Sequence, residues 1–415
     1  MDLTITPKKL SGNVNIPASK SISHRALICA ALADGISEIK NVTMSEDIHA
    51  TMDVLTKLGA SFTVNGNCIT VAGMHTPSDN AVLNCNESGS TLRFIIPVAC
   101  ALGTTSEFHG KGRLPQRPIS IYTRELSDKG ITFDYNNTMP FSVSGKLTGG
   151  EYHIEGDISS QFITGLLLAL PLCEKDSVIK LTSTLQSRPY VDITTDCLRH
   201  FGIQITETEN EYIIKGNQKY RSCNFDVEAD FSQAAFFITA NAIGNNINID
   251  NLPDPALSAQ GDKKIIEIAE SICYNKKAGV FEDITIDASD IPDLVPTVSV
   301  LCSLSGCRTF ITNAQRLRIK ESDRLETTAQ MINNLGGNVT VTEDGLVIMP
   351  VDKFTGGTVD SFNDHRIAMA AAIAASVATG RVFIKNFDSI KKSYPDFLTD
   401  YKKLGGTVQN GIILE

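Results

Sequence analysis

A pattern of about seventy residues recurs along this chain of 415 residues. Each copy has an apolar helix-like segment, a turn and a strand-like segment. The copies are 26–42, 91–109, 162–181, 234–249, 295–311 and 367–384. Five of the turns carry a glycine, at Gly35, Gly103, Gly244, Gly306 and Gly380. Glycine there predicts a left-handed residue that ends the helix.

A second glycine recurs at the same spacing of about seventy residues as the first. It closes another helical segment and precedes a hairpin with alternating apolar residues, as at 338–341 and 345–348. The markers are Gly59, Gly130, Gly202, Gly336 and Gly405, and the fourth copy, around 265–286, is degraded. Two markers in phase predict six repeated α/β modules, each with two helices and a few strands, although ordinary α/β alternation in one parallel sheet is the alternative.

The length exceeds what one hydrophobic core usually supports. Six units most simply form two domains of three units each. We expect one domain to comprise 20–226 and the other 1–19 plus 227–415, with the leading strand completing the last unit after Gly406. Both termini would then lie in one domain, and we expect the active site in the cleft between the domains.

Composition narrows the class of protein. Apolar residues make up 42% and the formal charge is −10, so a disordered chain or a general binder of nucleic acid or anionic membranes is disfavoured. The ten cysteines form no C-x-x-C pair, and most lie in apolar runs such as those around Cys29, Cys100, Cys173 and Cys302. That pattern is typical of reduced, packed thiols and predicts a cytoplasmic protein. The longest uncharged apolar stretch, 367–378, is too short to span a bilayer.

The residues at the starts of the recurrent helices indicate the ligand. Ser, Asn and Asp there are explained by capping of free N–H groups. Capping does not explain Lys20, Arg25, Arg93 or Arg366, because a cation is disfavoured at the positive end of a helix. A cation there is explained if a phosphate or carboxylate shares the site. These positions therefore predict polyanionic ligands.

Two further segments add positive charge. Residues 111–118 form a loop punctuated by Gly112 and two prolines that contains Arg117, and Lys320 and Arg324 lie at i and i+4 beside Glu321. A solvated helix face is the alternative for the second segment, and a solvated loop for 391–395. The sequence contains no P-loop, dinucleotide fingerprint, zinc motif or nucleophile elbow.

Several motifs resemble the signature set of the 5-enolpyruvylshikimate-3-phosphate synthase family, which belongs to the enolpyruvyl transferases. They occur in the family's order over nearly the whole chain, at 17–25, 112–119, 159–161, 291–293, 320–324 and 363–366. The resemblance implies an α/β fold of two domains, each with three repeated β-α-β-α-β-β units. It also implies transfer of the enolpyruvyl group of phosphoenolpyruvate to the 5-hydroxyl of shikimate 3-phosphate, with release of phosphate. This step leads to chorismate and the aromatic amino acids.

The resemblance also implies the site residues. Shikimate 3-phosphate would be bound by Lys20, Ser21, Arg25, Ser159, Ser160, Gln161, Ser187, Tyr190, Asp293 and Lys320. Phosphoenolpyruvate would be bound by Lys20, Gly89, Arg93, Arg117, Gln161, Arg324, Arg366 and Lys392. We expect no metal and no organic cofactor, no nucleic-acid or membrane partner, and a monomer.

The reaction is an addition followed by an elimination, so it requires two proton-handling groups. Asp293 is the candidate base at the 5-hydroxyl, and Glu321 is the candidate donor to the methylene carbon, with Lys20 as competitor or helper. The sequence departs from the family at 87–91, where Glu-Ser-Gly-Ser-Thr replaces Asn-Ala-Gly-Thr-Ala, and at Arg316, where some members have Asn. The first departure leaves open the contacts at the phosphoenolpyruvate phosphate and the sensitivity to glyphosate.

Two alternatives remain. The sister transferase that acts on UDP-N-acetylglucosamine shares the architecture, but it typically uses a loop cysteine, and 111–118 contains none. A non-catalytic relative would be expected to lose its proton-transfer residues, yet Lys20, Asp293 and Glu321 are all present.

Overall fold

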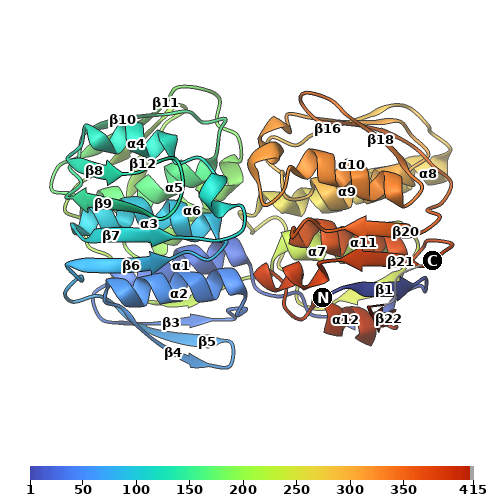
Figure 1. The fold of residues 1–415 in the computed structure, drawn as a ribbon, viewed down its shortest axis with the longest axis horizontal. Helices are drawn as coiled ribbons and strands as arrows, with labels where there is room; N and C mark the ends of the chain where they lie inside the picture. Colours follow the sequence, from blue (N-terminus) through green and yellow to red (C-terminus); the bar gives the residue numbers. More distant parts are fainter. Residues whose placement is uncertain (412–415) are drawn as a thin grey trace. The chain divides into compact units, whose positions relative to one another are not determined.

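The computed structural model describes residues 1–411 and divides the chain into two compact units. The inserted unit is Ala18–Glu228, and the terminal unit joins Met1–Pro17 to the chain from Ala229 onward. In Figure 1 the inserted unit is coloured blue to green, and the terminal unit yellow to red except for its dark-blue segment Met1–Pro17.

The inserted unit contains three four-stranded sheets of one design. Each has a parallel pair of strands followed by an antiparallel hairpin, in the orders β14-β3-β5-β4, β6-β7-β9-β8 and β10-β11-β13-β12. The strands are β3 (Ile36–Lys40), β4 (Ser61–Asn65), β5 (Cys68–Ala72), β6 (Asn80–Asn84), β7 (Thr105–His109), β8 (Ile131–Asp134), β9 (Phe141–Gly145), β10 (Glu151–Ile154), β11 (Ser177–Leu181), β12 (Ile205–Glu207), β13 (Glu211–Ile214) and β14 (Asn224–Asp226). The helices are α1 (Lys20–Leu32), α2 (Glu46–Leu58), α3 (Gly89–Leu102), α4 (Ser120–Ser127), α5 (Ser160–Ala169) and α6 (Arg188–His200), with short 3-10 helices η1 (Leu114–Gln116) and η2 (Leu170–Leu172).

The terminal unit repeats this design twice and has a reduced third copy. Its sheets are β16-β17-β19-β18, β20-β21-β1-β22 and the parallel pair β15-β2. The strands are β1 (Leu3–Thr6), β2 (Ser11–Val14), β15 (Asn246–Ile249), β16 (Ile284–Asp287), β17 (Thr309–Thr312), β18 (Asn338–Val341), β19 (Leu346–Met349), β20 (Gly357–Asp360), β21 (Val382–Lys385) and β22 (Thr407–Asn410). The helices are α7 (Phe231–Ala242), α8 (Lys264–Ala278), α9 (Val295–Ser303), α10 (Arg324–Asn334), α11 (His365–Ala375) and α12 (Phe397–Lys403), with η3 (Gly261–Lys263), η4 (Gln315–Ile319) and η5 (Phe387–Lys392).

The first strand of the chain belongs to its last sheet. β1 lies between β21 and β22 and is antiparallel to both, with Leu3 opposite Ile384 on one side and Asn410 on the other. Figure 1 shows this dark-blue strand among the red elements. The degraded fourth copy is the one whose sheet contains only β15 and β2 among the described residues.

The recurrent helices are buried because they are apolar on most faces. All of α11 and nearly all of α3 and α5 are inaccessible to solvent. Gly165 of α5 shows how closely these helices pack, because a Cβ atom there would lie 2.3 Å from the backbone oxygen of Arg93 in α3. The helices of each unit therefore form its core and fix the positions of their N-terminal ends.

The second glycine marker has the expected conformation in all its copies, with positive φ at Gly59, Gly130, Gly202, Gly336 and Gly405. The first glycine marker has a positive φ at Gly35, Gly103, Gly244 and Gly306. Gly380 does not, so the prediction of a left-handed residue is wrong there. Gly380 is required for a different reason, since a Cβ atom there would lie 2.5 Å from the backbone oxygen of Thr355.

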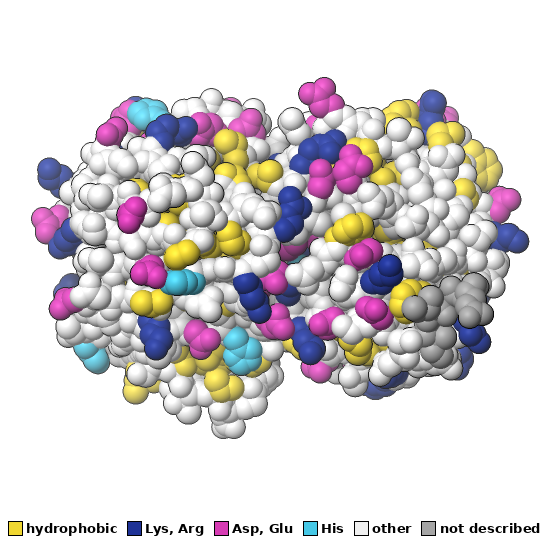
Figure 2. Space-filling view, viewed as in Figure 1, with side chains coloured by type: hydrophobic (Ala, Val, Ile, Leu, Met, Phe, Trp, Pro, Cys, Tyr) yellow, Lys and Arg dark blue, Asp and Glu magenta, His cyan; other side chains and the backbone are white. Residues whose placement is uncertain are grey.

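The cysteines and the surface charges are as the composition predicts. All ten cysteines are free, and Cys29, Cys100, Cys173 and Cys302 are buried, as predicted. On the face drawn in Figure 2, Lys and Arg side chains are interspersed with Asp and Glu. Within residues 1–411, the apolar helices all fall short of the length needed to cross a bilayer.

Candidate active site

Side-chain caps begin five of the six recurrent helices. The capping residues are Ser19, Ser88, Ser159, Asp230 and Asp364. The exception is α9, whose N-cap is Leu294 and makes no side-chain bond. Asp293 precedes this cap and is therefore available for other interactions, so capping does not explain this carboxylate.

Lys20 is the first residue of α1, and an acidic partner holds it there. Its Nζ lies 2.7 Å from Oδ2 of Asp47, in the first turn of α2, and both side chains are largely buried. The carboxylate offsets the cost of placing a cation at the positive end of a helix. Sequence reasoning missed Asp47, which lies in the first turn after the Ser45 cap.

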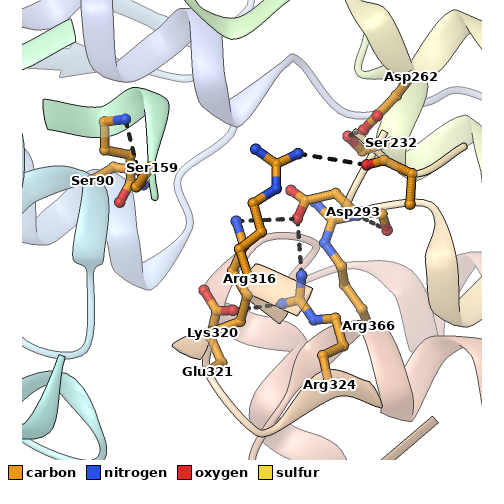
Figure 3. Close-up of polar contacts among 12 residues, drawn as sticks. Ser90, Ser159, Ser232, Asp262, Asp293, Arg316, Lys320, Glu321, Arg324 and Arg366 are labelled. Carbon is orange, nitrogen blue, oxygen red and sulfur yellow. Dashed lines mark hydrogen bonds and ion pairs between the residues drawn. The ribbon is translucent and has the colours of Figure 1, made fainter. Parts of the chain in front are cut away.

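Arg93 joins the beginnings of α3 and α5. Its guanidinium donates to Oε1 of Gln161 at 2.7 Å and to the backbone oxygen of Pro118 at 3.1 Å. The Gln161 amide donates in turn to Ser90 Oγ at 3.0 Å, in the region drawn in Figure 3. Arg93 is the fifth residue of α3 rather than part of its first turn, and its long side chain reaches back toward the helix start.

Arg25 connects α1 to α6. Its Nε donates to Thr194 at 2.7 Å, and the other guanidinium nitrogens donate to the backbone oxygens of Ser21 at 2.6 Å and Tyr190 at 2.9 Å. Burial lowers the pKa of Arg25 to about 10. This guanidinium therefore fixes the backbone around Ser21 and Tyr190, close to Ser187, the residue before α6.

Arg117 lies against the glycine that begins α3. A Cβ atom on Gly89 would lie 2.2 Å from one guanidinium nitrogen of Arg117 and 2.6 Å from its central carbon. Arg117 is buried, whereas Lys111 and Arg113 of the same loop are exposed. Only one cation of this loop is thus built into the inserted unit.

The terminal unit gathers cations around Asp293 (Figure 3). Oδ1 lies 2.9 Å from Arg324 and Oδ2 lies 2.6 Å from Arg366, and Lys320 Nζ is 4.0 Å away. Burial alone would raise the pKa of Asp293, but the charges of Arg366 and Lys320 outweigh it and hold this pKa well below its usual range. These charges therefore favour the ionised form of Asp293.

Lys320 experiences the opposite effect. Burial lowers its pKa to about 8, and the charge of Asp293 opposes this shift only in part. A lysine with this pKa loses its charge within the range over which an enzyme is normally assayed.

Arg324 is almost completely buried, at 1% side-chain exposure, and three carboxylates surround it. Besides Asp293, it donates to Glu321 and, through Nε at 3.0 Å, to Asp364. The interpretation of Lys320 and Arg324 as one helix face is wrong, because Lys320 is extended and α10 begins only at Arg324. The charge run is a buried network, not a solvated surface.

Lys392 and Arg316 lie at the edges of this network. Lys392 ends η5, is only 5% exposed, and donates to the backbone oxygen of Asn363 at 2.6 Å, so the solvated-loop alternative is wrong. Arg316 is buried and donates to the backbone oxygen of Ser289.

Another buried carboxylate, Asp262 of η3, escaped sequence reasoning. It accepts a hydrogen bond from Ser232 in the first turn of α7, as Figure 3 shows. Burial, reinforced by the charge of Asp293, raises the pKa of Asp262 to about 7. Asp262 lies about thirty residues from Ser232, so no local pattern could reveal the pair.

The expected site residues thus divide between the two units. The inserted half-site contains Lys20, Ser21, Arg25, Gly89, Arg93, Arg117, Ser159, Ser160, Gln161, Ser187 and Tyr190. The terminal half-site contains Asp293, Lys320, Glu321, Arg324, Arg366 and Lys392. Within each half-site, hydrogen bonds and ion pairs connect side chains from different helices.

Comparison with known proteins gives the family. A model of the EPSP synthase (3-phosphoshikimate 1-carboxyvinyltransferase) family matches residues 5–401. The chain belongs to the EPSP synthase family. It is 44% identical over 428 residues to the 3-phosphoshikimate 1-carboxyvinyltransferase of Clostridium novyi (strain NT), with 98% of each chain covered. It is 42% identical over 431 residues to that of Clostridioides difficile (strain 630), again with 98% of each covered.

A solved structure agrees with this assignment. EPSP synthase from Acinetobacter baumannii superposes with a TM-score of 0.79 at 25% identity, covering 98% of this chain and 99% of the other. The predicted two-domain α/β fold of the EPSP synthase family is therefore confirmed.

Proposed function

We propose that the two half-sites of this EPSP synthase family member act together on one pair of substrates, phosphoenolpyruvate and shikimate 3-phosphate. The reaction transfers the enolpyruvyl group of the first to the 5-hydroxyl of the second and releases phosphate. Each substrate carries a phosphate and a carboxylate. Neither half-site alone contains all the expected cations, which supports a shared active site.

The burial of five cations supports their assignment to phosphoenolpyruvate binding. Arg93, Arg117, Arg324, Arg366 and Lys392 are all inaccessible or nearly so. Buried cations interact more strongly with an anion than exposed ones, because water screens them less. We assign these residues, with Lys20, Gly89 and Gln161, to phosphoenolpyruvate.

Hydroxyl groups, Gln161, Asp293 and three cations are assigned to shikimate 3-phosphate. Ser160 and Ser187 would bind its phosphate, since both lie at helix starts, where backbone N–H groups favour an anion. Lys20, Ser21, Ser159, Gln161, Asp293 and Lys320 would contact the rest of the molecule, and Tyr190 would lie against its ring. Arg25 is assigned to the same substrate, and its hydrogen bonds to protein atoms support a positioning contribution as well.

Asp293 is assigned as the base that accepts the 5-hydroxyl proton. Two arginines hold its carboxylate, which makes it a weak base. Substrate anions compete for Arg324 and Arg366, so their binding would release the carboxylate and raise its pKa. The base would then gain strength only when phosphoenolpyruvate is bound.

Glu321 is assigned as the donor to the methylene carbon, with Lys20 as the alternative donor. Glu321 forms an ion pair with Arg324, and Lys20 forms one with Asp47. A bound substrate anion can weaken either ion pair. Deuterium incorporation into phosphoenolpyruvate in D₂O separates them. Glu321→Gln should abolish incorporation, and incorporation that persists there but is lost in Lys20→Met would assign the step to Lys20.

The observation that most strongly supports this proposal is that Arg324, Arg366 and Lys320 all approach the carboxylate of Asp293. The test is phosphate release: it should require phosphoenolpyruvate and shikimate 3-phosphate together and should not occur with UDP-N-acetylglucosamine. Release with the UDP-sugar, or none with either acceptor, would contradict the proposal.

Lysine acylation tests whether the active site is shared. Both substrates bound to the Asp293→Asn variant should protect Lys20 of the inserted unit and Lys392 of the terminal unit from acylation. Protection confined to one unit would contradict a joint site.

We also propose that the enzyme is a cytoplasmic monomer. Ten free cysteines, most of them buried, support a reducing compartment. Light scattering should give a mass near 44.9 kDa, and a multiple of that mass would contradict the monomer.

A further inference from the structure

The terminal unit contains a cavity of about 640 Å³ that shares no lining residue with either half-site. Buried apolar side chains form part of it, among them Ile272 of α8, Leu301 of α9 and Ala378 after α11. Small-molecule sites typically have volumes of about 300–1,000 Å³ and mostly apolar walls. The cavity is therefore large enough for a small organic molecule.

Lysines surround this cavity. They are Lys8, Lys9, Lys276, Lys277 and Lys353, and all of them are exposed. The only carboxylate in the lining is Asp352, and no ion pair joins any of these lysines to a carboxylate within residues 1–411. The cavity is thus a local concentration of positive charge in an acidic chain.

Compensation of helix dipoles explains part of this arrangement. Lys276 and Lys277 lie in the last turn of α8, and Lys276 donates to the backbone oxygen of Leu304 at 2.9 Å, just after α9. Lys9 lies beside Gly244, which follows α7. Cations at helix C-termini are stabilising. Dipole compensation does not explain Lys353, which lies in a loop, or the cavity between the lysines.

We propose that this cavity binds a small organic anion with an apolar body. The body packs on Ile272, Leu301 and Ala378, and the anionic group lies at the lysine rim. The negative ends of α7 and α9 face this region and disfavour an anion deep in the cavity, which fixes the orientation of the ligand.

Cys273 provides a local reporter, because it lines the cavity and is partly exposed. The anionic probe is 8-anilinonaphthalene-1-sulfonate. The neutral control probe is N-phenyl-1-naphthylamine, which is the same molecule without the sulfonate group. The experiment measures alkylation of Cys273 by iodoacetamide, peptide by peptide, at increasing probe concentration. The variant replaces Lys9, Lys277 and Lys353 by Gln, and the control replaces Lys385, Lys402 and Lys403 by Gln to give the same net charge.

The sulfonate should slow alkylation of Cys273 in the native protein and in the control. In the cavity variant we expect its affinity to fall by roughly tenfold or more, and added NaCl should weaken it in the native protein. The neutral probe should bind more weakly than the sulfonate and equally to all three proteins. Unprotected Cys273, or equal protection by both probes, would overturn the proposal, as would an affinity unchanged in the cavity variant.

Discussion

Asp293 interacts with Arg366 through both its side chain and its backbone. One guanidinium nitrogen lies 2.6 Å from Oδ2 and the other donates to the backbone oxygen at 3.1 Å. This two-point contact orients the arginine while neutralising the carboxylate. Under the proposed assignment, a substrate anion that binds Arg366 would loosen its hold on Asp293 and so would link binding to activation of the proposed base.

Asp293→Asn tests this link. The amide retains the size of the side chain but cannot accept a proton, so kcat should fall by about 10²–10⁴-fold. The KM for phosphoenolpyruvate should change much less. Steady-state kinetics with both substrates measures the two effects, and unchanged turnover would remove Asp293 from the base role.

Gly89→Ala should displace Arg117, because the new methyl group would stand 2.2 Å from its guanidinium. We expect phosphoenolpyruvate affinity to weaken by about 1.5–3 kcal/mol, the cost of one charged contact. The Arg117→Ala background is the control: there Gly89→Ala should add little. Additive losses in the double variant would show that Gly89 acts independently of Arg117.

The pKa of Lys320, lowered to about 8 by burial, predicts a pH effect on shikimate 3-phosphate. The side chain is charged below this pH and neutral above it. The kcat/KM for shikimate 3-phosphate should therefore decline as the pH rises through about 8. Lys320→Arg, which stays charged, should lack this inflection, and an inflection that persists there belongs to another group.

Asp262 predicts a pH effect on stability. Burial raises its pKa from 3.8 to about 7, so folding favours the protonated form. This contribution is fully present below pH 3.8 and is lost as the pH rises through about 7. As the pH rises from 3.8 to about 7, the native protein should therefore lose stability relative to the Asp262→Asn variant. The difference in the free energy of unfolding should reach the order of a few kcal/mol. The difference in Tm between the two proteins across this range measures it, and a constant difference would contradict the assignment.

The repeated architecture could be predicted because its signals are local. Apolar helices such as α11 and the left-handed glycines at 59 and 336 depend on short stretches of chain. The family motifs likewise indicated the site residues that line the helix starts.

The partners of the cations could not be predicted in the same way. Asp47, Asp262 and Asp364 contact residues 27, 30 and 40 positions away, and only the tertiary structure brings them together. The helix boundary at Arg324 is a different case. Asp323 followed by Glu326 is a capping pattern, and it marks the start of α10 that the charge spacing obscured.

The position of β1 has a consequence for synthesis on the ribosome. The inserted unit is complete in sequence by Glu228, so nothing prevents it from folding while translation continues. β1 is translated long before its neighbours β21 and β22. Until β21 and β22 have been translated, both hydrogen-bonding edges of this strand lack their native partners, which favours binding by chaperones.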